Sequence, residues 1–305
     1  MRGGLDGLDG LELRRHVPES REFYAARGER RGASSFAEVL EVRAAAPPRT
    51  EGTVEHVVAE GGRPVALRVF LPETAPVRGV HLEIPGGGFY LGQTAGGDAR
   101  NAALAESLGI AVVSVDHRLA PEHPWPAAPD DCEAAARWLV EHAADRFGTT
   151  RLAIGGSSAG ATLAVTTLLR LRDTGTATAF AGAVLQFGTY DLSGSTPAGR
   201  LIADEYFLEA YVGHVADRTL PDVSPVFGDL RDLPPTLLVV GARDVLLEDN
   251  RAMAARLRAA GNDVDLRVYP ESPHGFTGHP TGMARAALAE RDSWLAERLA
   301  AHAGA

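Results

Sequence analysis

Lysine is absent from this sequence of 305 residues, and cysteine occurs only once. All 30 basic residues are therefore arginines, which excludes chemistry that needs a lysine amine, such as a Schiff base or the lysine of a P-loop. The single cysteine, Cys132, excludes an internal disulfide and any metal site built from several cysteines. Because Cys132 lies in an alanine-rich helical stretch, we expect a small buried apolar residue there and not a reactive thiol.

Basic residues are also fewer than acidic ones. The 40 acidic residues outnumber the basic ones, and the formal net charge of −10 argues against binding to nucleic acid or to an anionic membrane surface. No run of about 18 apolar residues occurs, so we expect no membrane span. The first residues contain no apolar segment of the kind found in signal peptides, and the default expectation is a cytoplasmic protein.

Strands and helices alternate along most of the chain, which predicts a mostly parallel sheet flanked by helices and hence an α/β fold. Strands are predicted at 54–59, 65–71, 80–84, 110–115, 152–154, 181–187, 236–240 and 265–269, and helices at 18–27, 34–46, 98–108, 130–146, 250–260 and 283–301, with Asp98 expected as the N-cap of the third helix. We expect one domain over residues 1–305. Two segments fit the alternation poorly, about 1–46 and about 191–225, and are expected to lie above the sheet.

The stretch around Ser158 predicts a catalytic nucleophile. An apolar run at 152–154 is followed by Gly156-Ser157-Ser158-Ala159-Gly160 and then by a run of good helix formers. Strand, tight turn and helix is the setting in which a G-x-S-x-G pattern forms a nucleophile elbow. The two outer glycines matter because the backbone of the serine is strained and a Cβ on either neighbour would crowd the turn. Five residues alone are weak evidence, so the assignment depends on finding partners for the serine.

Asp244 and His274 meet the requirements for those partners. A serine hydroxyl needs a general base, and the base needs a carboxylate that orients it. In the α/β-hydrolase arrangement the order along the chain is serine, acid, histidine, and each partner follows a strand because active sites lie at the carboxyl ends of parallel strands. Asp244 comes four residues after the strand at 236–240, and His274 comes five residues after the strand at 265–269.

The tetrahedral intermediate of acyl transfer also needs amide donors for its oxyanion. In this fold they come from the residue after the nucleophile, here Ala159, and from the loop after the third strand. Gly86-Gly87-Gly88 stands at that place, and three residues without side chains allow the backbone N–H groups to face a substrate carbonyl.

With these residues located, the chain resembles the hormone-sensitive lipase family of α/β-hydrolase esterases. The carrying segments are Ile84-Pro85-Gly86-Gly87-Gly88-Phe89, Asp116-His117-Arg118-Leu119-Ala120-Pro121-Glu122-His123-Pro124, Gly156-Ser157-Ser158-Ala159-Gly160, Asp244-Val245-Leu246 and His274-Gly275-Phe276. The resemblance implies an eight-stranded sheet, a helical cap formed by about 1–46 plus about 191–225, and hydrolysis of a short-acyl or small-metabolite ester without metal or organic cofactor. Homodimers are common among such enzymes.

The same resemblance implies a role for each site residue. Ser158 is the expected nucleophile, His274 the base and Asp244 the residue that orients it. The amides of Gly87, Gly88 and Ala159 are the expected oxyanion hole. For the substrate we expect contacts from Phe89 and Tyr90, which directly follow the glycines, while Tyr190, Tyr206, Phe207, Tyr211 and Phe276 are further aromatic candidates for either core or pocket.

Two positions depart from the family pattern. The motif before the glycines usually begins with histidine, and here that position is Pro85; the tyrosine usual after the aspartate of the second segment is His117. Proline fixes φ and removes an N–H, which can re-aim the loop. These departures leave other reactions open: an amidase or N-deacetylase, or a lyase or cyclase acting on a biosynthetic intermediate with the same triad. A small-molecule receptor without catalysis is disfavoured because His274 is present.

Overall fold

The structure is a computed structural model that describes residues 13–27, 32–49, 53–58, 63–73, 76–92 and 94–301. Residues 1–12 and 28–31 of the expected cap lie outside these ranges. No helix among the described residues combines the length and the apolar character that crossing a membrane requires.

Eight strands form one sheet, as the resemblance implied, in the order β1-β2-β4-β3-β5-β6-β7-β8. Only the β1–β2 and β2–β4 pairs are antiparallel, and all the others are parallel. The carboxyl ends of the parallel strands therefore meet at one edge of the sheet. The strands are β1 (Thr53–Val58), β2 (Pro64–Phe70), β3 (Val80–Ile84), β4 (Ala111–Asp116), β5 (Leu152–Ser157), β6 (Phe180–Gln186), β7 (Thr236–Gly241) and β8 (Val264–Tyr269).

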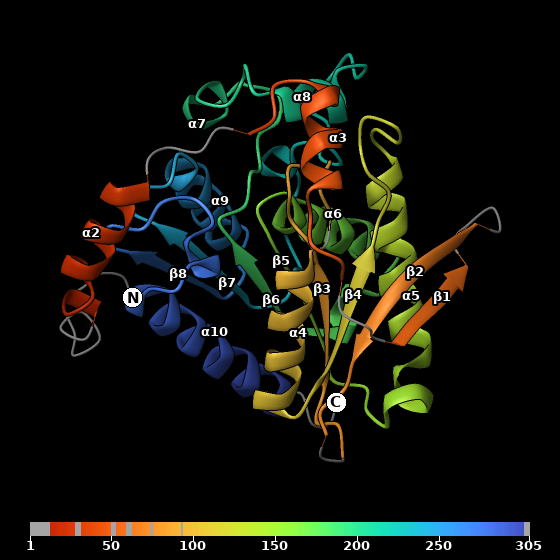
Figure 1. The fold of residues 1–305 in the computed structure, drawn as a ribbon. Coiled ribbons are helices and arrows are strands. Elements are labelled where there is room, and N and C mark those ends of the chain that lie inside the picture. The colour runs from red at the N-terminus through yellow and green to blue at the C-terminus, as the bar shows by residue number, and fades with distance from the viewer. Residues whose placement is uncertain are drawn as a thin grey trace.

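Helices cover both faces of this sheet (Figure 1). One face packs against α4 and α10, and the opposite face packs against α5, α6 and α9. The apolar residues divide into one core cluster for each face, which explains why the central strands read as nearly continuous apolar runs. The helices are α2 (Val17–Arg27), α3 (Phe36–Ala44), α4 (Ala95–Leu108), α5 (Ala127–Phe147), α6 (Ala159–Asp173), α7 (Pro197–Arg200), α8 (Tyr206–Val212), α9 (Leu247–Ala259) and α10 (Gly282–Ala301).

The predicted elements agree with the observed ones within a few residues, with one wrong detail at the start of α4. The side chain of Thr94, not of Asp98, caps this helix by accepting a hydrogen bond from the N–H of Gly97 at 3.1 Å. Asp98 lies in the first turn with a fully buried side chain, and Arg68 on β2 pairs with it at 3.1 Å. A partner 30 residues away in the sequence therefore determines the role of Asp98. Cys132 is fully buried, as expected, and burial raises the pKa of its thiol well above the ordinary value.

The segments outside the alternation lie at two places. Helices α3, α7 and α8 lie near the carboxyl ends of the strands, whereas α2 lies beside α10 (Figure 1). The Glu19 carboxylate on α2 accepts a hydrogen bond from the N–H of Gly282, the first residue of α10, at 2.9 Å. Arg43 on α3 donates to the carbonyl of Tyr90 and to the carboxylate of Glu122, so α3 is fixed beside the glycine loop.

Candidate active site

Ser158 occupies a strained turn between β5 and α6. Its φ of 52° and ψ of −121° lie in a region that side-chain-bearing residues rarely adopt, as the elbow pattern predicted. The glycines on either side are required by space. A Cβ on Gly160 would lie 2.0 Å from the carbonyl oxygen of Ile84, and a Cβ on Gly156 would lie 2.5 Å from the backbone of Gly160. The turn thus brings α6 into direct backbone contact with the end of β3.

The structure brings His274 and Asp244 to this serine. His274 Nε2 lies 2.9 Å from Ser158 Oγ, and His274 Nδ1 lies 3.1 Å from each carboxylate oxygen of Asp244. A carboxylate can only accept a hydrogen bond, so the ring nitrogen that faces it, Nδ1, carries an N–H. In the neutral ring Nε2 is then unprotonated and can accept the proton of the serine. The Asp244 side chain is fully buried, while that of His274 is 37% exposed. This is the geometry of a nucleophile, a base and an orienting acid.

Backbone contacts between two loops hold the acid against the base. The N–H of Arg243 donates to the carbonyl of Ser272 at 3.0 Å, and the N–H of Leu246 donates to the Asp244 carboxylate at 2.9 Å. Gly241 makes the close approach possible, since a Cβ there would lie 1.9 Å from the carbonyl oxygen of Ser272. The loops that follow β7 and β8 are therefore held together by the backbone contacts of Arg243 and Gly241 with Ser272.

The glycine loop after β3 faces the serine from the other side. Gly87 and Gly88 have φ of 107° and 59°, and a Cβ on Gly86 would lie 2.3 Å from the carbonyl oxygen of Ser157. Among the described residues, no group accepts a hydrogen bond from the N–H of Gly87 or Gly88. Gly87, Gly88 and Ala159, the first residue of α6, all line the cavity in front of Ser158.

A cavity of about 570 Å³ opens from Ser158 and His274. Phe89 and Tyr90 both line it, together with Phe207. Phe89 is almost completely buried and stacks on Tyr211, with ring centroids 3.9 Å apart and an interplanar angle of 3°. Of the other aromatic candidates, Tyr190, Tyr211 and Phe276 are core residues with at most 2% exposure.

Comparison with known proteins places the chain in a family. The family model described as the alpha/beta hydrolase fold matches residues 82–278, a range that contains the serine, the acid, the base and the glycine loop. This chain belongs to the α/β-hydrolase family. Within it, the likeness to hormone-sensitive lipase is confirmed by the crystal structure of a hormone-sensitive lipase from a metagenome library, which is 30% identical, has a TM-score of 0.72 and covers 94% of this chain and 98% of its own.

Two mycobacterial proteins illustrate the sequence relatives of this α/β-hydrolase. Esterase LipI of Mycobacterium tuberculosis is 32% identical over 78% of this chain and 79% of its own length. Carboxylic ester hydrolase LipN of the same organism is 35% identical over 63% of this chain, and the match spans only 55% of LipN.

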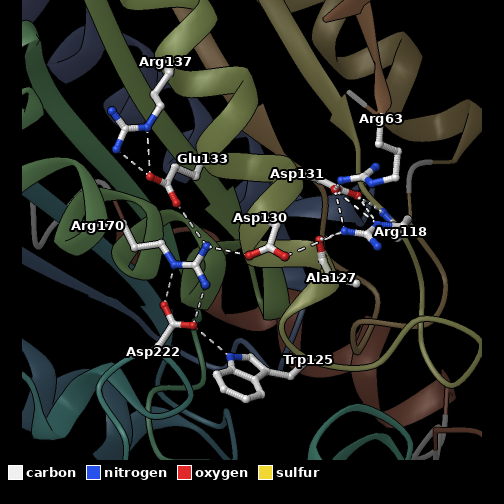
Figure 2. Close-up of polar contacts among 10 residues, drawn as sticks. All are labelled: Arg63, Arg118, Trp125, Ala127, Asp130, Asp131, Glu133, Arg137, Arg170 and Asp222. Atoms are coloured by element: carbon white, nitrogen blue, oxygen red, sulfur yellow. Dashed lines mark hydrogen bonds and ion pairs between the residues drawn. The ribbon is translucent and has the colours of Figure 1, made fainter. Parts of the chain in front are cut away.

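Charged side chains connect the loop after β4 to the start of α5 (Figure 2). The backbone N–H of Arg118 donates to the Asp131 carboxylate at 2.8 Å, and its guanidinium donates to the same carboxylate at 3.0 Å and to the carbonyl of Ala127 at 3.0 Å. Arg63 pairs with Asp131 as well. Arg118 does not line the cavity, and its hydrogen bonds hold the loop after β4 against α5.

A second cluster in Figure 2 joins α5 and α6 to the chain segment that follows α8. Arg170 on α6 donates to Asp222 at 2.6 and 2.7 Å, to Asp130 at 2.9 Å and to Glu133 at 3.1 Å. The indole N–H of Trp125 donates to Asp222 at 2.9 Å. Asp222 thus fixes the segment after α8 to Trp125, which precedes α5, and through Arg170 to α6 and α5.

Several cavity residues were missed by the sequence reasoning. Phe187 packs edge-on against the ring of His274, with centroids 5.1 Å apart. Glu83, Asn101 and Gln186 line the cavity although each lies in an element that reads as ordinary strand or helix. The strand register places Gln186 opposite Ser157 and therefore next to the elbow, but this register depends on the pairing of β5 with β6 and cannot be read from either strand alone.

Proposed function

We propose that the protein is a carboxylesterase-type serine hydrolase in which Ser158 is the nucleophile, His274 the base and Asp244 the residue that orients it. The observation that carries the proposal is the unbroken chain of contacts from Ser158 Oγ through His274 to the buried Asp244 carboxylate, with distances of 2.9 and 3.1 Å. The mycobacterial relatives, named as an esterase and a carboxylic ester hydrolase, support the same reaction.

Catalysis then follows from the geometry. His274 Nε2 takes the proton of Ser158 as its oxygen attacks the ester carbonyl, and Asp244 stabilises the imidazolium. The N–H groups of Gly87, Gly88 and Ala159 stabilise the oxyanion, which is worth several kcal/mol in the transition state. His274 next protonates the leaving alkoxide, and an acyl-enzyme ester remains on Ser158. A water activated by His274 attacks that ester, and the acid leaves as Ser158 regains its proton.

The surroundings of the serine support a small substrate and a cap. The cavity of about 570 Å³ fits a short-acyl or small-metabolite ester. Leu201, Ile202 and Phe207 line it from the segment between β6 and β7. We propose that this segment and α3 form the cap, and that Phe89 and Tyr90 contact the acyl or alcohol group.

The test replaces Ser158 by alanine. Ser158→Ala should lower the kcat for p-nitrophenyl butyrate by about 10⁴-fold or more and abolish labelling by a fluorophosphonate, because both need the serine oxygen. Ser293→Ala, at an exposed serine on α10, is the matched control and should keep both signals. Unchanged hydrolysis or labelling in Ser158→Ala would show that another group is the nucleophile.

A further inference from the structure

The sheet face beneath α4 and α10 carries polar side chains at its carboxyl edge. Side chains alternate along a strand, and Val80, Leu82 and Ile84 of β3 point into the core on the α5 and α6 side. His81 and Glu83 therefore face α4 and α10. The register places Glu83 beside Gly155 of β5, and Ser157 of β5 opposite Gln186 of β6.

These side chains form one lobe of the cavity. Glu83, Ser157 and Gln186 line it from the sheet, and Asn101 of α4 and Arg291 of α10 line it from above. We use "polar lobe" for these five residues. The lobe is continuous with the space in front of Ser158, since the same cavity is lined by the elbow and by the glycine loop.

Two groups in the polar lobe are left without partners. Asn101 and Gln186 are each 6% exposed, and among the described residues no group hydrogen-bonds to Asn101 Nδ2 or to Gln186 Oε1. A buried donor and a buried acceptor without partners are destabilising unless a ligand satisfies them. Glu83 is tied through one carboxylate oxygen to His81 Nε2 at 3.0 Å, and Arg291 bonds to Asp292.

We propose that the polar lobe binds a hydroxyl-bearing part of the substrate, so that the preferred ester carries a free hydroxyl group on its acyl or alcohol portion. This inference rests on the proposed hydrolase function. A hydroxyl both donates and accepts, so it satisfies Gln186 Oε1 or the Glu83 carboxylate as well as Asn101 Nδ2. An alkyl chain would leave all of them unpaired. A positively charged substrate group would be repelled by Arg291, and a negatively charged one would be repelled by Glu83.

The experiment compares kcat/KM for two matched ester pairs. Glyceryl 1-monobutyrate against propyl butyrate tests the alcohol side, and ethyl 3-hydroxybutyrate against ethyl butyrate tests the acyl side. The hydroxylated member of at least one pair should be favoured by about tenfold or more, because a site built to hydrogen-bond a hydroxyl discriminates against the analogue that lacks it. Preference for the alkyl member in both pairs would overturn the inference.

Two variants locate the selectivity in the polar lobe. Asn101→Leu and Gln186→Leu should each reduce the preference for the hydroxylated ester by about tenfold, measured as the ratio of kcat/KM for the two members of a pair. The matched control is Thr167→Val in α6, which also removes a buried unpartnered oxygen but lies outside the cavity. Equal selectivity in wild type and both variants would refute the assignment.

The same measurements separate this inference from the proposed function. Hydrolysis of p-nitrophenyl butyrate together with fluorophosphonate labelling, but no preference for hydroxylated esters, would refute the polar lobe alone. A folded protein that neither hydrolyses any of these esters nor reacts with the fluorophosphonate would refute the hydrolase function and the inference with it.

Discussion

Asp249 carries a buried carboxylate whose protonation we expect to control stability near neutral pH. It lies in the first turn of α9, is 1% exposed, and accepts hydrogen bonds from the backbone N–H groups of Tyr190 and Asp191 through one oxygen only. Among the described residues, its other oxygen has no partner. Burial raises the pKa of Asp249 from 3.8 to about 6, against the smaller effect of the two N–H donors. The perturbation is Asp249→Asn, which keeps an acceptor for both amides and removes the titration.

The sign and size of the effect follow from this shift. A carboxyl group with a raised pKa in the folded state stabilises the fold at low pH, where it is protonated, and this contribution is lost as the pH rises through about 6. One unit of pKa is worth about 1.4 kcal/mol, so the loss between pH 4.5 and pH 7.5 amounts to about 2 kcal/mol. Asp249→Asn lacks this loss, and its stability relative to wild type should rise with pH by that amount.

The assay is urea unfolding of both proteins at several pH values between 4.5 and 7.5. Asp191→Asn is a control for which no pH dependence is expected in this range. Burial raises the pKa of Asp191, but hydrogen bonds from Ser193 and Thr196 outweigh it and the net shift is downward. Because the pKa of Asp191 lies below 3.8 in the folded state, its carboxyl group is ionised in both states between pH 4.5 and 7.5, and the stability of Asp191→Asn relative to wild type should stay nearly constant over this range. A constant difference between Asp249→Asn and wild type across this range would refute the reasoning, because it would mean that Asp249 titrates alike in the folded and unfolded states.

Two further substitutions test the scaffold of the site. Gly160→Ala would place a Cβ 2.0 Å from the carbonyl oxygen of Ile84, so we expect the free energy of unfolding in urea to fall by about 3 kcal/mol or more and kcat to fall as well. Gly96→Ala, on α4, is the control: its Cβ would have no atom closer than 3.7 Å, and the variant should be tolerated. Arg170→Met removes the cation shared by Asp222, Asp130 and Glu133 and should cost about 2–3 kcal/mol, although Glu133 still pairs with Arg137. Arg231→Met, at an exposed ion pair, should leave the unfolding midpoint unchanged, and equal effects of the two arginine variants would contradict the role given to Arg170.

The architecture and the central residues were predictable from the sequence because local rules determine them. Asp244 and His274 could be found because parallel strands end at one edge of the sheet, so the loops that follow them lie together at that edge. The glycines around Ser158 could be interpreted because no other residue fits a turn with that backbone. In each case the sequence signal and the structural requirement lie within a few residues of each other.

The polar lobe could not be predicted in this way. The strand at 80–84 alternates apolar and polar residues, a pattern that suits a strand with one face in water as well as one beneath a cavity. Only the packing of α4 and α10 decides that Glu83 faces a pocket. Asp98 shows the same limit, because its partner Arg68 comes from a distant strand. Contacts between distant segments determine this part of the cavity wall, in contrast to Phe89 and Tyr90, which could be predicted because they directly follow the glycines.

The two departures from the family pattern, Pro85 and His117, are separate in the sequence but adjacent in the structure. His117 is buried, with Nδ1 2.9 Å from the carbonyl oxygen of Arg118 and Nε2 3.5 Å from that of Pro85. Both carbonyl oxygens can only accept hydrogen bonds, and the contact to Pro85 is the longer of the two. The same carbonyl oxygen would lie 2.8 Å from a Cβ on Gly160. The Pro85 carbonyl thus lies between the elbow and His117, and any effect of Pro85 on the glycine loop acts together with His117.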